Sequence, residues 1–277
     1  MRNFKIRQGL VALPAAVVMS VGFAGSASAH AVYSVDYPWH NSAGDHCMIN
    51  KSQVGDGESG GGEFKGWSES GFNELVPYVD CEYPRNRPAG HLADGMQIWV
   101  VDPSTNEWVL CARTDQTYYN TKEAYSLQLT WTAPAAGMCF TDGSYGLYNH
   151  AAIHSDGDWT PTFNNPLWSG VHHNLGWPTS AAGETAAPTE SALRPPWVNA
   201  DGTMDPEKVP HKAKVADPNG GVVTGEDGKP VEVSTKLPAP DKAPANGGGG
   251  QRTTKVTENG STVEVVEAEM IRVADTL

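Results

Sequence analysis

The sequence predicts an all-β protein, in the form of a disulfide-bonded β-sandwich or small barrel followed by a largely disordered C-terminal tail. Three observations support this prediction. Short apolar runs are separated by turn-forming residues, as in sheets of short strands. Four cysteines, an even number, follow a segment typical of export. Aromatic residues, which carry much of the burial in a small core, almost disappear after position 178.

The first 29 residues predict a secretory signal peptide. Arg2, Lys5 and Arg7 form a positively charged start, Leu10–Phe23 is an apolar run, and Ala24–Ala29 supplies the small residues of a cleavage site. The apolar run is shorter than the roughly 20 residues of a membrane-spanning helix. No other stretch of the chain is apolar enough to span a membrane. We therefore expect a secreted, extracellular protein with no transmembrane segment.

Composition divides the rest of the chain into three parts. Eight of the nine Trp and all nine Tyr lie within residues 30–178, which we expect to form a β-rich folded domain with two disulfides. Residues 179–250 are rich in Pro, Gly and Ala and predict a linker. Residues 251–277 predict a short hairpin-like or disordered tail, because Asn259-Gly260 is a strong hairpin turn signal.

Strand patterns are clearest in the middle of the domain. Met96–Val101 and Glu107–Arg113 flank a turn-rich loop and predict a hairpin. Tyr125–Thr132 alternates between apolar and polar residues, and Tyr145–His154 is a further strand ending in an Asp-Gly turn. The segment Gly66–Val79 predicts one short helix.

The four cysteines predict two disulfides, because an exported chain meets an oxidising environment. Three pairings are compatible with the sequence. The sequential pairing closes two loops of about thirty residues, and each crosslink would add about 3–4 kcal/mol through loop-closure entropy. We favour this pairing over the other two. The expected disulfide residues are Cys47, Cys81, Cys111 and Cys139.

The charge of the chain excludes general nucleic-acid binding. The sequence contains 19 Lys and Arg against 32 Asp and Glu, a net charge of −13. Removal of the three positive charges of the signal peptide makes the mature chain still more acidic. Neutralisation of phosphates requires Lys and Arg. The expected partner is therefore a glycan or a protein at the cell exterior, and not a nucleic acid.

The histidines have two interpretations. They could be ordinary surface or hydrogen-bonded side chains, or some of them could bind a metal ion. His150 and His154 lie four residues apart and share one face of either a helix or a strand. His172 follows eighteen residues after His154. Neutral imidazole is a common ligand of copper and zinc. These residues form the candidate metal set, together with His30.

His30 adds a second metal hypothesis. Cleavage after Ala29 would make His30 the mature N-terminus, whereas cleavage after Ala31 would remove it. With a further histidine, the amine and ring of His30 could chelate copper in a site that resembles the histidine brace of secreted polysaccharide monooxygenases. The resemblance rests on this position and on a disulfide-bonded β-rich domain. It would imply oxidative chemistry on polysaccharide, with copper as the cofactor.

Tryptophans near turn-forming residues have two interpretations. They could form the core, or they could be partly exposed and stack on sugar rings. Trp99, Trp108 and Trp131 fall in strand patterns and are expected in the core. The candidate ligand-binding residues lie among Pro, Gly and Asn, and they are Trp39, Trp67, Trp159, Trp168 and Trp177.

These observations predict a secreted binding module whose ligand is a cell-wall or environmental glycan or another extracellular partner. No cofactor is required by this interpretation, and the residues do not decide whether the protein is an enzyme. The first alternative is a secreted mononuclear copper protein with a histidine brace at His30, acting oxidatively on polysaccharide. The second is a structural surface protein that assembles through its C-terminal tail by strand addition.

Overall fold

The computed structural model shows a protein built almost entirely of β-strands. It describes residues 31–57, 61–73, 81, 83–134, 139–140, 143–175, 194–199, 204–205, 207–240 and 249–277. The signal peptide, His30 and Trp177 lie outside these ranges. Helical structure in the described residues is limited to short 3-10 turns, and the two large sheets do not close into a barrel. None of the described helical turns is long enough to cross a membrane.

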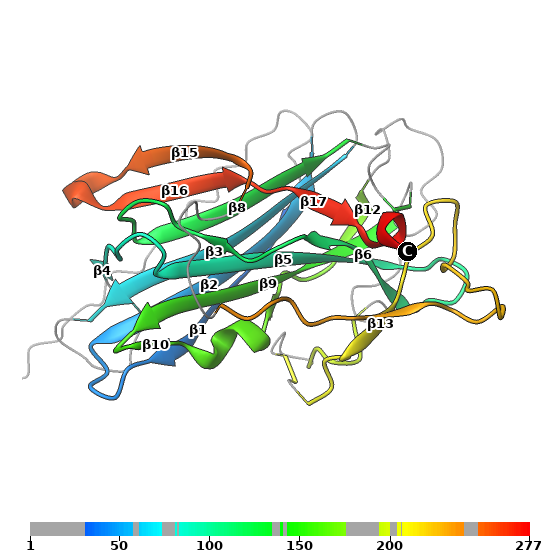
Figure 1. The fold of residues 1–277 in the computed structure, drawn as a ribbon, viewed down its shortest axis with the longest axis horizontal. Coiled ribbons are helices and arrows are strands. Elements are labelled where there is room, and N and C mark those ends of the chain that lie inside the picture. Colours follow the sequence, from blue (N-terminus) through cyan, green and yellow to red (C-terminus); the bar gives the residue numbers. More distant parts are fainter. Residues whose placement is uncertain are drawn as a thin grey trace, which may run out of the picture.

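The first sheet has seven strands and is shown in Figure 1 with its C-terminal strands in orange and red. Its order is β1 (Ala31–His40), β2 (His46–Asp56), β3 (Gly62–Phe72), β8 (Ser126–Ala133), β16 (Thr262–Glu267) and β15 (Gln251–Val256), with β4 (Tyr83–Pro84) paired to the end of β3.

The second sheet has eight strands and packs face to face against the first. Its order is β10 (Asp158–Trp159), β9 (Gly143–Ser155), β5 (Leu92–Val101), β6 (Trp108–Thr114) and β17 (Met270–Arg272). The short strands β11 (Leu167–Trp168) and β12 (His172–Leu175) pair with β9, and β7 (Tyr118–Tyr119) pairs with β5. A separate pair joins β13 (Lys212–Lys214) to β14 (Glu232–Ser234).

The strands predicted from the alternating and apolar patterns are confirmed as β5, β6, β8 and β9, and β5 and β6 form the expected hairpin. The helix expected within Gly66–Val79 is wrong over its described part, because β3 continues to Phe72. Phe64 and Ser68 of β3 are fully buried, whereas Trp67 between them is partly exposed. This two-residue alternation is that of a strand with one covered face.

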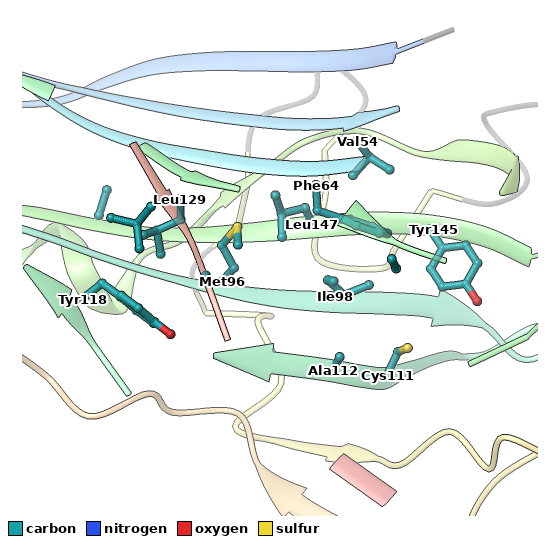
Figure 2. Close-up of a cluster of buried hydrophobic side chains, with 14 of the residues drawn as sticks. Val54, Phe64, Met96, Ile98, Cys111, Ala112, Tyr118, Leu129, Tyr145 and Leu147 are labelled. Atoms are coloured by element: carbon teal, nitrogen blue, oxygen red, sulfur yellow. The ribbon is translucent and has the colours of Figure 1, made fainter. Parts of the chain in front are cut away.

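The main core lies between the two sheets, as Figure 2 shows. Val54 and Phe64 project from the first sheet, and Met96, Ile98 and Leu147 project from the second. All five side chains have no exposed surface. Burial of each such side chain contributes about 1.5–3 kcal/mol, so this layer is the main force that holds the sheets together.

Both disulfides have the sequential pairing that the sequence analysis favoured. Cys47 bonds to Cys81 beside the end of β3, and Cys111 bonds to Cys139. The second disulfide connects β6 of the second sheet to the chain segment that leaves β8 of the first. The Tyr145 hydroxyl accepts a hydrogen bond from the Phe140 N–H and donates one to its carbonyl, both at 2.8 Å. This crossover between the sheets is therefore fixed covalently and by hydrogen bonds.

The C-terminal residues complete both sheets, which differs from the largely disordered tail expected. Strands β15 and β16 form an antiparallel hairpin, and β16 pairs in parallel with β8. A few residues later β17 pairs antiparallel with β6 of the other sheet. The hairpin signal located the turn, where Asn259 and Gly260 both have positive φ. The composition of the tail does not show that the hairpin packs on the first sheet. That packing depends on contacts with distant strands, and Val266 of β16 is fully buried by such contacts.

Residues 194–199 and 207–240, which fall in the expected linker, cover the outer face of the second sheet. Trp197 and Val215 pack with Trp99 in one apolar cluster, and Leu237 packs with Phe163 in another. Figure 1 shows part of this segment in yellow, including β13, running beside the second sheet. Its apolar residues occur as one or two at a time among prolines, glycines and charged residues, so no extended apolar run marks them as core residues.

A buried carboxylate attaches the C-terminal hairpin to the rest of the molecule. Glu264 of β16 is 1 % exposed and accepts a hydrogen bond from Arg252 Nη1 at 2.6 Å. It also accepts hydrogen bonds from the Thr121 backbone N–H at 2.7 Å, the Thr121 hydroxyl at 2.8 Å and the Lys122 N–H at 3.3 Å. This single side chain therefore accepts hydrogen bonds both from the loop between β7 and β8 and from the neighbouring strand β15.

We predict that Glu264→Gln lowers the free energy of unfolding by about 3 kcal/mol, because it leaves Arg252 without its buried ionic partner. Urea denaturation measures the change. Glu267→Gln, on an exposed position of the same strand, is the matched control and should change stability by less than about 0.5 kcal/mol. Equal effects of the two substitutions would contradict the role assigned to Glu264.

Candidate functional site

The structure places the candidate tryptophans in different environments. Trp168 is 3 % exposed and packs against Trp108 and Tyr148, so it is a core residue. Trp39 packs against the core between the sheets, and Trp159 packs beside His154 and Tyr119. Trp177 lies outside the described residues. Trp67 is the candidate that projects from the outer face of the first sheet.

This outer face, here called the open face, is formed by the outward side chains of β1, β2, β3, β8, β16 and β15. The inward positions of these strands, such as Phe64 and Leu129, belong to the core between the sheets. Because side chains alternate along a strand, the positions between them point away from the core. The three apolar clusters of the described residues lie between the sheets or against the second sheet, and none covers the open face.

Strand register arranges the open face in rows that cross the sheet. The strands lie about 4.8 Å apart, and successive rows are separated by about 7 Å. One row consists of Val35, Lys51, Trp67, Gln128, Val265 and Thr253. The next row consists of Tyr33, Gln53, Lys65, Thr130, Glu267 and Gln251. The face thus combines two aromatic rings with amide, hydroxyl and charged groups.

Tyr33 and Trp67 form an aromatic corner on this face. Their ring centroids lie 6.0 Å apart and their planes are nearly perpendicular, at 83°. Tyr33 is 51 % exposed, and Tyr37 on the same edge strand is 39 % exposed. Partial burial and the charge of Glu69 raise the pKa of Tyr33, so its phenol remains a hydrogen-bond donor at neutral pH. The corner offers an apolar ring face beside a polar hydroxyl.

The charges around this corner are largely paired. Lys51 Nζ lies 2.6 Å from Glu69 Oε2, and Lys65 Nζ lies 2.8 Å from Glu63 Oε1. The Ser126 hydroxyl also donates to Glu69, at 3.3 Å. These pairs leave the central part of the open face close to electrically neutral, although the whole chain is strongly acidic.

The candidate metal-binding histidines are separated from one another. His150 and His154 share a face of β9, but four residues of strand span about 13 Å, which is too far for one metal ion. His172 Nε2 lies 3.5 Å from Asp56 near the opposite end of the sheet. Within the described residues no three His, Cys, Asp or Glu side chains are grouped to hold a metal ion. His30 lies outside these residues.

His150 is a buried neutral histidine. Its Nδ1 lies 2.9 Å from the carbonyl oxygen of Phe163, so Nδ1 carries the proton and donates it. Its Nε2 is buried with no hydrogen-bond partner. Burial lowers the pKa of His150 to about 4, and the hydrogen bond to Phe163 offsets only part of this effect.

We predict that His150 makes the fold sensitive to acid. The pKa of His150 is lower in the folded than in the unfolded chain. Its contribution to the free energy of unfolding is therefore complete above about pH 6.5 and is lost as the pH falls toward 4. The loss amounts to roughly 3 kcal/mol. Urea denaturation should show that the free energy of unfolding declines less between pH 7 and pH 4 for His150→Asn than for the unaltered protein. The exposed control His211→Asn should leave the decline unchanged.

Asp94 of β5 is a second buried titratable group, located on the core side of its strand between Leu92 and Met96. It has no exposed surface, and neither carboxylate oxygen has a hydrogen-bond partner. Burial raises its pKa well above the ordinary value, and the nearby Asn149 amide and Gly95 N–H offset only part of that effect. Burial therefore favours the neutral form of this carboxyl group over its charged form.

We predict that Asp94→Asn stabilises the protein increasingly as the pH rises. The folded state must keep a proton on Asp94 that the unfolded state releases above about pH 4, so this cost grows with pH until the folded-state pKa. The free energy of unfolding of Asp94→Asn, relative to that of the unaltered protein, should increase by up to about 1.4 kcal/mol per pH unit. Thermal and urea unfolding from pH 4 to pH 8 measure it. An equal pH dependence for the exposed control Asp158→Asn would contradict the assignment.

Sequence reasoning found Trp67 but missed its neighbours. Tyr33 and Val35 precede the first strand that the sequence predicts, and the one site residue predicted in residues 30–38 is His30, the candidate copper ligand beside the cleavage site. The alternation of Val32, Tyr33, Ser34 and Val35 is a strand signal that could have located β1. Gln53 and Gln128 carry no signal of their own, because only the strand register brings them beside the two aromatic rings.

Comparisons with known proteins add no family to this description. No family model matches the chain, and no significant match is found among curated proteins or solved structures.

Proposed function

We propose that this protein is a secreted, extracellular binding module that recognises a glycan through its open face. The observation that carries the proposal is the corner formed by Tyr33 and Trp67 on an uncovered sheet surface. Indole and phenol rings bury large apolar areas while their polar groups remain available for hydrogen bonds. Sugar rings need both kinds of contact, because their C–H faces are apolar and their hydroxyl groups are polar.

The polar residues around the corner support a glycan as the ligand. Gln53 lies opposite Tyr33 in the sheet register, and Gln128 lies opposite Trp67. An amide can both donate and accept hydrogen bonds, as recognition of a sugar hydroxyl requires. Because Lys51 and Lys65 are paired with carboxylates, the face favours an uncharged sugar over an acidic one.

The ring geometry favours a single chain over a crystalline surface. Two nearly perpendicular rings cannot both lie flat against one plane. They can instead hold one sugar unit, with Trp67 against one face and Tyr33 against its edge. The proposed ligand is therefore a soluble or amorphous neutral polysaccharide, and binding should depend weakly on salt.

We predict that Trp67→Ala and Tyr33→Ala each weaken binding to a soluble neutral polysaccharide by about tenfold, which corresponds to about 1.4 kcal/mol. Affinity electrophoresis against a panel of soluble glycans would identify a ligand, and titration calorimetry would measure each variant. Tyr83→Ala is the matched control, because Tyr83 is similarly exposed, at 45 %, but lies at the end of β3. It should bind with unchanged affinity.

Two results would contradict the proposal. One is absence of binding across the panel of soluble glycans. The other is binding that Trp67→Ala and Tyr33→Ala leave unaltered, since the ligand would then lie elsewhere on the molecule.

A further inference from the structure

A second candidate site lies on the opposite side of the molecule from the open face. A cavity of about 370 Å³ is bounded by the outer face of the second sheet and by the segment that covers it. Its walls include Trp99 from β5, Trp108 from β6 and Trp197 from the covering segment. The Trp99 and Trp197 rings lie 5.3 Å apart, and both are buried. Trp99 has no exposed surface and Trp197 is 7 % exposed, so the partly exposed Trp108 supplies the accessible aromatic wall of the cavity.

The mouth of this cavity carries basic side chains in an otherwise acidic protein. Arg194, Lys212 and Lys214 line it, together with Glu107 and Glu232. Lys214 forms an ion pair with Glu107. With that pair neutralised, two exposed cations, Arg194 and Lys212, face a single remaining carboxylate, Glu232. The cavity mouth thus has the opposite sign to the chain, in which acids outnumber bases by 32 to 19.

We propose that this cavity binds an acidic sugar, that is, a sugar unit bearing a carboxylate or sulfate group. The partly exposed ring of Trp108 would pack against the sugar, and the anionic group would be held by Arg194 and Lys212 at the mouth. A guanidinium group can bind either anion through two parallel hydrogen bonds. This site is separate from the open face, because its residues belong to the second sheet and its covering segment.

Titration calorimetry with an oligogalacturonate and with a neutral oligosaccharide of the same length tests this proposal, using the full mature chain. The acidic oligosaccharide should bind, and its affinity should fall at least about fivefold for Arg194→Gln and for Lys212→Gln, since each loses a charge-assisted hydrogen bond. Glu232→Gln should strengthen binding, because it removes the opposing charge. Raising the salt concentration to about 0.5 M should weaken binding through charge screening.

The control variants distinguish this cavity from general electrostatics and from the open face. Lys229→Gln removes the same charge from an exposed turn of the covering segment, and it should leave the affinity unchanged. Trp67→Ala should also have no effect. A sulfated galactan oligosaccharide, which carries sulfate groups and no carboxylate, tests whether sulfate can replace the carboxylate.

Three outcomes would overturn the proposal. These are no binding of either acidic oligosaccharide, equal binding of the neutral one, or binding that Arg194→Gln and Lys212→Gln do not alter. Loss of acidic-sugar binding in Trp67→Ala alone would place that ligand on the open face instead. A glycan-binding open face could fail its own test without affecting this result, because the open face and the cavity share no residue and are tested with different ligands.

Discussion

The parallel pairing of β16 with β8 is the constraint on which the rest of the structure depends. It places the C-terminal hairpin at the edge of the first sheet, and the chain then crosses directly to add β17 to the second sheet. Glu264 strengthens this arrangement because its buried carboxylate binds both Arg252 and the loop at Thr121. The two sheets are thus joined by their shared core, by the Cys111–Cys139 disulfide and by the last residues of the chain. Strand β15 of this hairpin then forms the edge of the first sheet.

The two outer faces of the sandwich differ in both covering and charge. The first sheet presents an uncovered surface on which Lys51 and Lys65 are paired with carboxylates beside an aromatic corner. The outer face of the second sheet is largely covered by the segment that contains Trp197 and Lys212, and the incomplete fit leaves a cavity with basic residues at its mouth. The domain therefore has two chemically different surfaces, and we propose that they bind neutral and acidic sugars respectively.

Several elements could be recognised from the sequence because their signals are local. Alternation in Tyr125–Thr132 and the apolar run of Met96–Val101 identified strands, and Asn259-Gly260 identified the hairpin turn. The segment around Trp67 was assigned to a helix because its glycines and polar residues obscured the alternation. Residues 207–240 resembled a linker for a related reason: Val215 and Leu237 are isolated in the sequence and become core residues only by packing against strands more than a hundred residues away.

The sequence by itself determined the all-β class and the number of disulfides, and it predicts an export signal before the domain. These properties depend on residue periodicity, on cysteine count and on the order of charged, apolar and small residues, all of which are local. Only the tertiary structure decided which tryptophans are exposed, which histidines lie apart and where the cationic cavity forms. Exposure depends on what packs against each side of a sheet, and Trp67 and Trp168 have similar sequence surroundings but different faces and neighbours. Long-range packing therefore determines which of several residues with similar sequence surroundings lie on a candidate binding surface.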